Sequence, residues 1–257
     1  MTISPIRVSL SGAAAGLIAS RDKAEPWKTA AAQAVAAKHV GGYIREPCAV
    51  QLSFNMVHAR YADTALFNLL KATIDGLSNT IFATSPSGQP GVWSREDWRI
   101  TELHADKYRT FQSPSVEIGI GPIGSTRTES VGVPIAELFV PGNVPPLSGD
   151  AAGQVRVIQW RGAIQAGVRM VQPVGPDTEI SVAFDFGIEP NRARRTDIDN
   201  LCVPAAQAVC SAVFGDLRHG HKLVALRATK SVAGGFGALG THVRIWRWSG
   251  GGASHGR

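Results

Sequence analysis

The chain has 257 residues, of which 44% are hydrophobic and 18% are charged. This composition allows a sizeable core and excludes a disordered protein, and the length accommodates one large domain or two smaller ones. No run of about 18 apolar residues occurs, and the first residues lack the features of a secretory signal, so we expect neither a membrane protein nor a secreted one. Three cysteines without a CxxC pair predict no disulfide framework and no cysteine zinc site, which fits the reducing cytoplasm.

The charge balance is basic, with 26 Lys and Arg against 20 Asp and Glu. The excess is local, because no acidic residue follows Asp216. The basic residues after it are Arg218, Lys222, Arg227, Lys230, Arg244, Arg247 and Arg257, and a second cluster is Arg192, Arg194 and Arg195. A basic pole of this kind attracts polyanions such as nucleic acids. The alternative is a solvated surface whose charge keeps the protein in solution.

Segments of the first half predict a strand, a helix, a strand, a helix and two strands, in that order. These segments are residues 6–10, 29–39, 50–57, 68–77, 98–107 and 116–120. Residues 50–57 alternate apolar and polar side chains, which is the period of a half-buried strand. Trp27 stands at the entry of the first predicted helix.

The second half predicts the same order of elements. Its segments are residues 135–140, 162–171, 180–186, 200–209, 223–230 and 243–248, with Trp160 at the entry of the first helix. Matched positions keep a similar spacing: Asn68 and Asn200 are 132 residues apart, and Lys107 and Lys230 are 123 residues apart. Six elements that recur in one order predict a tandem duplication.

We therefore expect an α+β protein made of two tandem β-α-β-α-β-β modules, each a layer of helices on a small mixed sheet. The modules are residues 1–122 and 134–257. Residues 123–133 are rich in Gly, Ser and Thr and have no apolar periodicity, so they are predicted to be a linker.

The strongest local signal is Arg194-Arg195-Thr196-Asp197-Ile198-Asp199-Asn200, at the start of the second helix of the second module. The two carboxylates converge if Asp197 lies in extended chain and Asp199 caps the helix. Oxygen ligands at a strand–helix junction suit a hard cation such as Mg²⁺, and the adjacent arginines would hold a phosphodiester. The alternative is that one aspartate caps the helix and the other pairs with an arginine.

The order of elements and the run Asp197-Ile198-Asp199-Asn200-Leu201 after an arginine-rich segment resemble the RusA family of Holliday-junction resolvases. The family motif is Asp-x-Asp-Asn-x-x-Lys, often followed by a proline, with an acidic pair before the next strand. Pro204 falls where the family often has its proline. The first half shows the same frame in Ala65-Leu66-Phe67-Asn68-Leu69-Leu70-Lys71, and later has Glu96-Asp97.

The resemblance implies a single-chain pseudo-dimer of a crossover junction endodeoxyribonuclease, which acts in DNA recombination and repair, uses Mg²⁺ and holds each site within one subunit. In the first copy Ala65 and Phe67 replace both motif aspartates, while Lys71 is kept. Without those carboxylates the first copy is predicted to be silent.

The second copy keeps Asp197 and Asp199 but has Val203 at the lysine position. The residues expected to bind Mg²⁺ and to carry catalysis are Asp197, Asp199 and Asp216. Because the acidic pair reads Asp216-Leu217 here, the alternative is that the third ligand is missing. The duplication therefore predicts at most one working site, in the second half, and one nick where a resolvase makes two.

The function that we expect is a Mg²⁺-dependent, structure-selective endonuclease that binds branched DNA. The side chains expected to contact nucleic acid are Arg192, Arg194, Arg195, Arg218, Lys222 and Lys71. The alternative is a catalytically silent DNA- or RNA-binding subunit of a larger nucleoprotein assembly, with other protein subunits as partners. A third interpretation is a resemblance to RNA-binding CRISPR subunits of the repeat-associated type, based on the paired modules and the glycine-rich residues 233–240; the Asp-x-Asp-Asn motif argues against it.

Two smaller features leave alternatives open. His219 and His221 indicate either two ligands of a transition metal or a solvated loop. Trp246 and Trp248 share one face of the last predicted strand, where they would either stack on bases or pack against other aromatic side chains.

Overall fold

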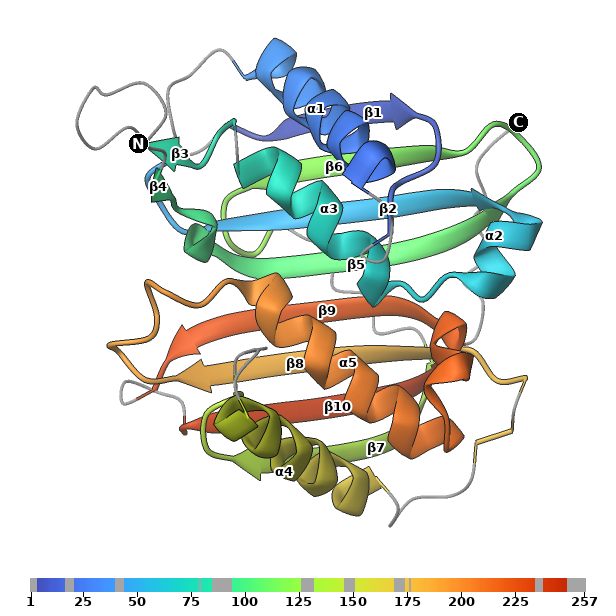
Figure 1. Cartoon of the computed structure of the whole chain (residues 1–257), viewed down its shortest axis with the longest axis vertical. Coiled ribbons are helices and arrows are strands. Elements are labelled where there is room, and N and C mark those ends of the chain that lie inside the picture. Colours follow the sequence, from blue (N-terminus) through green and yellow to red (C-terminus); the bar gives the residue numbers. More distant parts are fainter. Residues whose placement is uncertain are drawn as a thin grey trace.

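The computed structural model describes residues 4–16, 21–39, 44–78, 80–84, 94–125, 132–145, 151–168, 174–175, 177–233 and 238–248. One eight-stranded mixed sheet runs through the molecule, and the long helices cover a single face of it (Figure 1). The α+β class expected from the sequence is therefore confirmed. Within the described ranges, no helix is both long and apolar enough to cross a membrane.

The elements of the first half are β1 (Ile6–Ser11), α1 (Arg21–Lys38), β2 (Cys48–Val57), α2 (His58–Asp63), α3 (Phe67–Ser78), β3 (Ala83–Thr84), β4 (Ser94–Arg95), the 3₁₀ turn η1 (Asp97–Arg99), β5 (Ile100–Thr110) and β6 (Ser115–Gly121). Those of the second half are β7 (Gly132–Pro141), α4 (Ala151–Val168), β8 (Ile180–Ile188), α5 (Ile198–Phe214), the 3₁₀ helix η2 (Leu217–Lys222), β9 (Leu223–Val232) and β10 (Gly240–Trp248).

The two halves share one sheet topology. The strand order is β1-β6-β2-β5-β9-β8-β10-β7, so each half contributes four neighbouring strands and the order of the second half is the reverse of the first. β2 pairs in parallel with β5, and β8 pairs in parallel with β9. Each of these pairs has a register shift at the same point, after Cys48 in β2 and after Ile180 in β8. The repeat in the sequence is thus matched by a repeat in strand pairing.

The halves join where β5 pairs antiparallel with β9, a junction that we call the seam. The register is symmetric about the pair His104 and Arg227, because Glu102 lies opposite Thr229 and Asp106 lies opposite Ala225. One continuous sheet therefore replaces the separate small sheets that the sequence predicted. The first strand of the second half, β7, already begins at Gly132, inside the predicted linker.

The core lies between the sheet and the helix layer. Phe54 of β2 and Phe184 and Phe186 of β8 are buried there. α1 packs on α3, α4 packs on α5, and α3 meets α5 across the seam.

The two outer helices begin earlier than the sequence predicted. Trp27 and Trp160 lie inside α1 and α4 and do not stand at their entries. The residues before each tryptophan lack a clear apolar period, so the sequence pattern does not mark where either helix begins. Both indole rings are buried, as expected of core residues.

Candidate functional site

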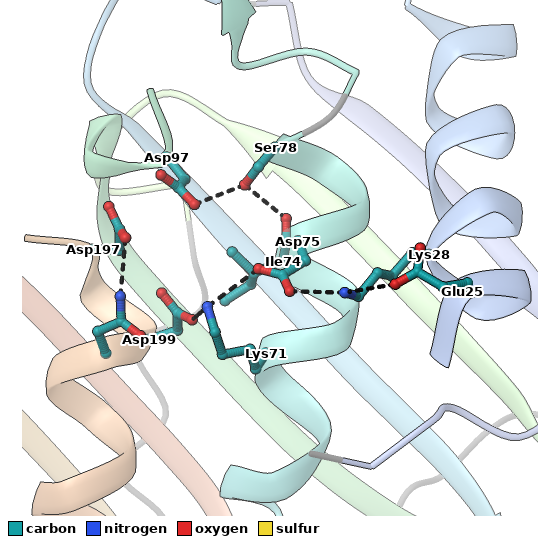
Figure 2. Close-up of polar contacts among 10 residues, drawn as sticks. Glu25, Lys28, Lys71, Ile74, Asp75, Ser78, Asp97, Asp197 and Asp199 are labelled. Atoms are coloured by element: carbon teal, nitrogen blue, oxygen red, sulfur yellow. Dashed lines mark hydrogen bonds and ion pairs between the residues drawn. The ribbon is translucent and has the colours of Figure 1, made fainter. Parts of the chain in front are cut away.

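Three carboxylates from the two halves lie together beside the seam; we call Asp97, Asp197 and Asp199 the carboxylate cluster. Asp97 is in η1 of the first half, and Asp197 and Asp199 are at the start of α5 in the second half. Figure 2 shows the three side chains pointing toward one another, with α3 running alongside. The family resemblance implied that each site lies within one half, whereas this cluster draws its carboxylates from both halves.

Asp199 is the most deeply placed member of the cluster. Its side chain is 1% exposed, and its Oδ2 atom lies 3.2 Å from Nζ of Lys71 on α3. Its Oδ1 atom is buried and has no hydrogen-bond partner among the described residues. Burial raises the pKa of Asp199, and the ammonium of Lys71 opposes that rise.

The helix cap differs from the prediction. Asp197, with extended backbone, occupies the N-cap position of α5, and Asp199 is the second residue of the helix, in its first turn. The Asp197 carboxylate does not cap the helix amides but accepts a hydrogen bond of 3.0 Å from Nδ2 of Asn200. The Asp199 side chain is buried beside the neighbouring helix α3, where it forms an ion pair with Lys71.

The charge of Asp197 is strongly perturbed. Burial and the neighbouring carboxylate of Asp97 raise the pKa of Asp197 to about 7. Two acids that approach this closely in a partly buried site cannot both ionise without cost. A site that crowds carboxylates against their mutual repulsion is typical of function more than of stability.

Neighbours on α3 and α1 hold the cluster in place. Ser78 Oγ donates to Asp97 Oδ2 at 2.9 Å. Lys71 Nζ also lies 3.2 Å from Asp75 Oδ1, and Lys28 Nζ of α1 lies 3.1 Å from Asp75 Oδ2. Burial lowers the pKa of Lys71, but the carboxylates of Asp199 and Asp75 raise it by more. The net effect is a pKa above the usual value, so this lysine stays charged.

The corresponding positions at the other end of the seam are apolar. A spacing of 132 residues matches Asp197, Asp199 and Lys71 with Ala65, Phe67 and Val203, and the spacing of 123 residues between Lys107 and Lys230 matches Asp97 with Gly220.

These four residues, Ala65, Phe67, Val203 and Gly220, form what we call the apolar counterpart. A Cβ atom on Gly220 would lie 3.2 Å from the Phe67 ring and 3.4 Å from Cβ of Ala65. Phe67 is 4% exposed and Val203 is 2% exposed. The fold therefore creates two equivalent places, of which one is lined by acids and a lysine and the other is filled with hydrocarbon.

This arrangement explains why each half keeps what the other has lost. Lys71 of the first half pairs with Asp199 of the second half, and Asp97 of the first half lies beside Asp197. Asp97 and Asp75 were missed as partners of Asp199 because sequence spacing carries no information on contacts across a seam.

The third expected metal ligand, Asp216, is not brought to the cluster. It lies beyond the far end of α5, whose 17 residues separate its ends by roughly 25 Å. There its Oδ1 atom accepts from the backbone amide of Arg218 at 2.8 Å, which caps η2, and its other oxygen pairs with the Arg218 guanidinium. This pairing lowers the pKa of Asp216, and the site prediction for it is replaced by a capping role.

The basic side chains that were predicted to contact nucleic acid do not all lie near the carboxylate cluster. Arg194 and Arg195 are exposed in the turn before α5, and the Arg194 guanidinium lies 5.9 Å from the ring centre of Trp98, which is next to Asp97. Arg192 instead donates to the carbonyl of Val144 at 3.0 Å.

The remaining basic candidates lie apart from the cluster. Arg218 is exposed beside Asp216, and Lys222 lies 3.8 Å from Asp177.

The other sequence features stay outside the cluster. His219 and His221 have ring centres 6.1 Å apart, and no third ligand joins them among the described residues. Trp246 lies under the Arg244 guanidinium at 6.0 Å, and Trp248 packs against the core. Most of the glycine-rich segment, residues 234–237, lies outside the described residues.

The donor set of the cluster suits a hard cation. All its ligand atoms are carboxylate oxygens, and Asp199 Oδ1 is a buried acceptor without a partner in the described chain. As the side chains stand, no three His, Cys, Asp or Glu residues within the described ranges converge as a bound metal ion requires. Binding would therefore need the carboxylates to turn toward a common point.

No protein-family model matches this chain. A search of curated proteins likewise finds no match. Among solved structures, the chain is similar to the cyanuric acid hydrolase from A. caulinodans, with 12% identity and a TM-score of 0.27 over 96% of this chain and 72% of that chain. A likeness this remote carries no argument about fold or function.

Proposed function

We propose that this protein is a Mg²⁺-assisted nuclease with one working site, built from both halves at the carboxylate cluster. The observation that carries the proposal is the contrast between the cluster and the apolar counterpart. Two equivalent places exist in the fold, yet all the acids and the lysine gather at one of them. Core packing alone gives no reason to bury Asp199 next to two other carboxylates.

Each polar group has a role in this proposal. Asp97, Asp197 and Asp199 would hold the cation, which when bound supplies Lewis acidity toward a phosphodiester and toward water. Lys71 holds Asp199 in its ionised form and fixes its direction. Arg194, exposed beside Trp98, would bind a phosphate that flanks the reacting one.

The RusA resemblance supplies the substrate class in this proposal, which is branched DNA. A pseudo-dimer with one site would nick one strand of a junction, whereas two symmetric nicks are needed to resolve it. We therefore propose a structure-selective nicking enzyme in a recombination or repair process. A cytoplasmic location stays a prediction.

The test is a cleavage assay on a four-way DNA junction with each strand labelled in turn. We expect Mg²⁺-dependent nicking that falls at least about 100-fold in Asp199→Asn and in Asp197→Asn. Asp216→Asn is the matched control, because it removes an aspartate of the same half that lies away from the cluster, and it should keep full activity. A wild-type protein that leaves every branched substrate intact with Mg²⁺ or Mn²⁺ would overturn the proposal.

A second candidate is a silent nucleic-acid-binding subunit of a larger assembly. It is favoured by the Lys71 ion pair, which already balances the charge of Asp199. If this candidate is right, DNA or RNA binding should be salt-sensitive. Arg194→Glu and Arg195→Glu should weaken that binding, and Asp199→Asn should leave it unchanged. Affinity that does not fall between low and moderate salt would exclude it.

A further inference from the structure

A buried lysine lies beneath the carboxylate cluster and joins the two segments that carry it. Lys230 of β9 is 8% exposed. Its Nζ atom donates to the carbonyl of Trp98 at 2.5 Å and to the carbonyl of Thr196 at 2.8 Å. Trp98 follows Asp97 in the chain and Thr196 precedes Asp197, so one ammonium group connects η1 of the first half to the start of α5 in the second.

The equivalent lysine makes the same connection at the apolar counterpart. Lys107 of β5 is 2% exposed. Its Nζ atom donates to the carbonyls of Thr64 at 2.8 Å, His221 at 2.5 Å and Tyr61 at 3.0 Å. Thr64 and His221 stand where Thr196 and Trp98 stand in the other half, but the residue after Thr64 is an alanine. The chain thus contains two matched lysine contacts, of which one has carboxylates beside it.

We infer that Lys230 is a positioning residue that holds Asp97 and Asp197 close enough together to share one cation. The bonded atoms are backbone carbonyls, so the lysine fixes the main chain on either side of the cluster without itself occupying a carboxylate oxygen. A positive charge at this point also offsets part of the repulsion among Asp97, Asp197 and Asp199.

The electrostatics of Lys230 agree with this role. Burial lowers the pKa of Lys230 to about 8, while the carboxylates of Asp197, Asp97 and Asp199 act in the opposite direction. The inference rests on the proposed function for the identity of the ligand. The carbonyl contacts themselves do not depend on it.

The test compares Lys230→Met with its matched control Lys107→Met, using Tb³⁺ luminescence as the probe of cation binding and melting temperature as the probe of folding. Both variants lose buried hydrogen bonds and should melt at lower temperature than the wild type. We expect the affinity for Tb³⁺ to fall at least tenfold in Lys230→Met and to stay within twofold of the wild type in Lys107→Met. Equal Tb³⁺ affinities in the two variants would overturn the inference.

A second measurement uses the metal-free protein. Backbone amide hydrogen exchange of the segment that contains Trp98 should accelerate in Lys230→Met and remain unchanged in Lys107→Met. Unchanged exchange in Lys230→Met contradicts the positioning role even if the wild type binds no cation. Absence of Tb³⁺ and Mn²⁺ binding by the wild type, by contrast, counts against the proposed function alone.

If Lys230→Met does not fold, the pair Lys230→Arg and Lys107→Arg replaces it. The planar guanidinium is larger than an ammonium and would push the two bonded carbonyls apart. We expect at least a threefold loss of Tb³⁺ affinity in Lys230→Arg and no loss in Lys107→Arg, and equal affinities would contradict the inference.

Discussion

At the scale of single residues, Asp199 and Asp197 show how burial and crowding perturb the carboxyl groups of the cluster. Burial raises the pKa of both carboxyl groups, and other carboxylates act in the same direction. Lys71 compensates Asp199, but its 3.2 Å contacts go to Asp199 and Asp75. We therefore expect the cluster to lower the stability of the folded protein, a cost that functional sites often carry.

We expect Asp197→Asn to stabilise the metal-free protein at pH 8 by about 0.5–2 kcal/mol, because it removes one charge from the crowded cluster. Urea unfolding of the wild type and the variant measures this difference. The control is Asp216→Asn, which keeps an oxygen that can accept from the Arg218 amide but loses the ion pair with the Arg218 guanidinium, and which should become slightly less stable. An Asp197→Asn variant that is less stable than the wild type would contradict the account.

Lys107 gives a pH-dependent prediction away from the cluster. Burial lowers the pKa of Lys107 from 10.5 to about 7. Between these values the unfolded chain binds a proton that the folded chain has released, so the stability contributed by this residue rises with pH. The penalty of the buried charge is fully present below pH 7 and disappears toward pH 10.5.

The free energy of unfolding of the wild type, relative to Lys107→Met, should therefore rise across this range, with a limit of about 1.4 kcal/mol for each pH unit. Urea titrations of both proteins at several pH values between 7 and 10 measure it. A difference that stays constant with pH would show that Lys107 is charged throughout.

At the scale of elements, the strands were predictable and the site was only partly so. The alternation in residues 50–57 and 180–186 placed β2 and β8 within a few residues of their observed bounds, since each strand buries one face on the helices. Asp197 and Asp199 could be singled out from the sequence because their motif is local. The pairing of Asp97 with them follows from the β5–β9 seam, and no local pattern encodes which edges of two half-sheets meet.

Close packing of α1 on α3 gives a prediction at this scale. A Cβ atom on Gly76 of α3 would lie 2.8 Å from the carbonyl oxygen of Lys28 on α1. We expect Gly76→Ala to destabilise the protein by about 1–3 kcal/mol, because the backbone of α1 must move. The equivalent position in α5 is Ala208, which is buried.

The matched control is Ala208→Gly, which should cost only about 0.5–1 kcal/mol through helix flexibility. Thermal unfolding of the two variants provides the comparison. A Gly76→Ala variant as stable as the wild type would contradict the close approach of the two helices.

At the scale of the whole molecule, the two halves share one topology but differ in the side chains at the two ends of the seam. The register about His104 and Arg227 treats the halves alike, and so do the paired contacts of Lys107 and Lys230. The side chains at the two ends of the seam do not, since one end holds the carboxylate cluster and the other the apolar counterpart. The single composite site per chain that we propose is a consequence of this difference.

Titration of the metal-free protein with Mn²⁺, followed by electron paramagnetic resonance, tests this consequence most directly. We expect one ion to bind per chain, and binding to be lost in Asp97→Asn of the first half as fully as in Asp199→Asn of the second, while Asp216→Asn binds like the wild type. Mn²⁺ binding that survives in Asp97→Asn, or that needs Asp216, would contradict a single site built from both halves.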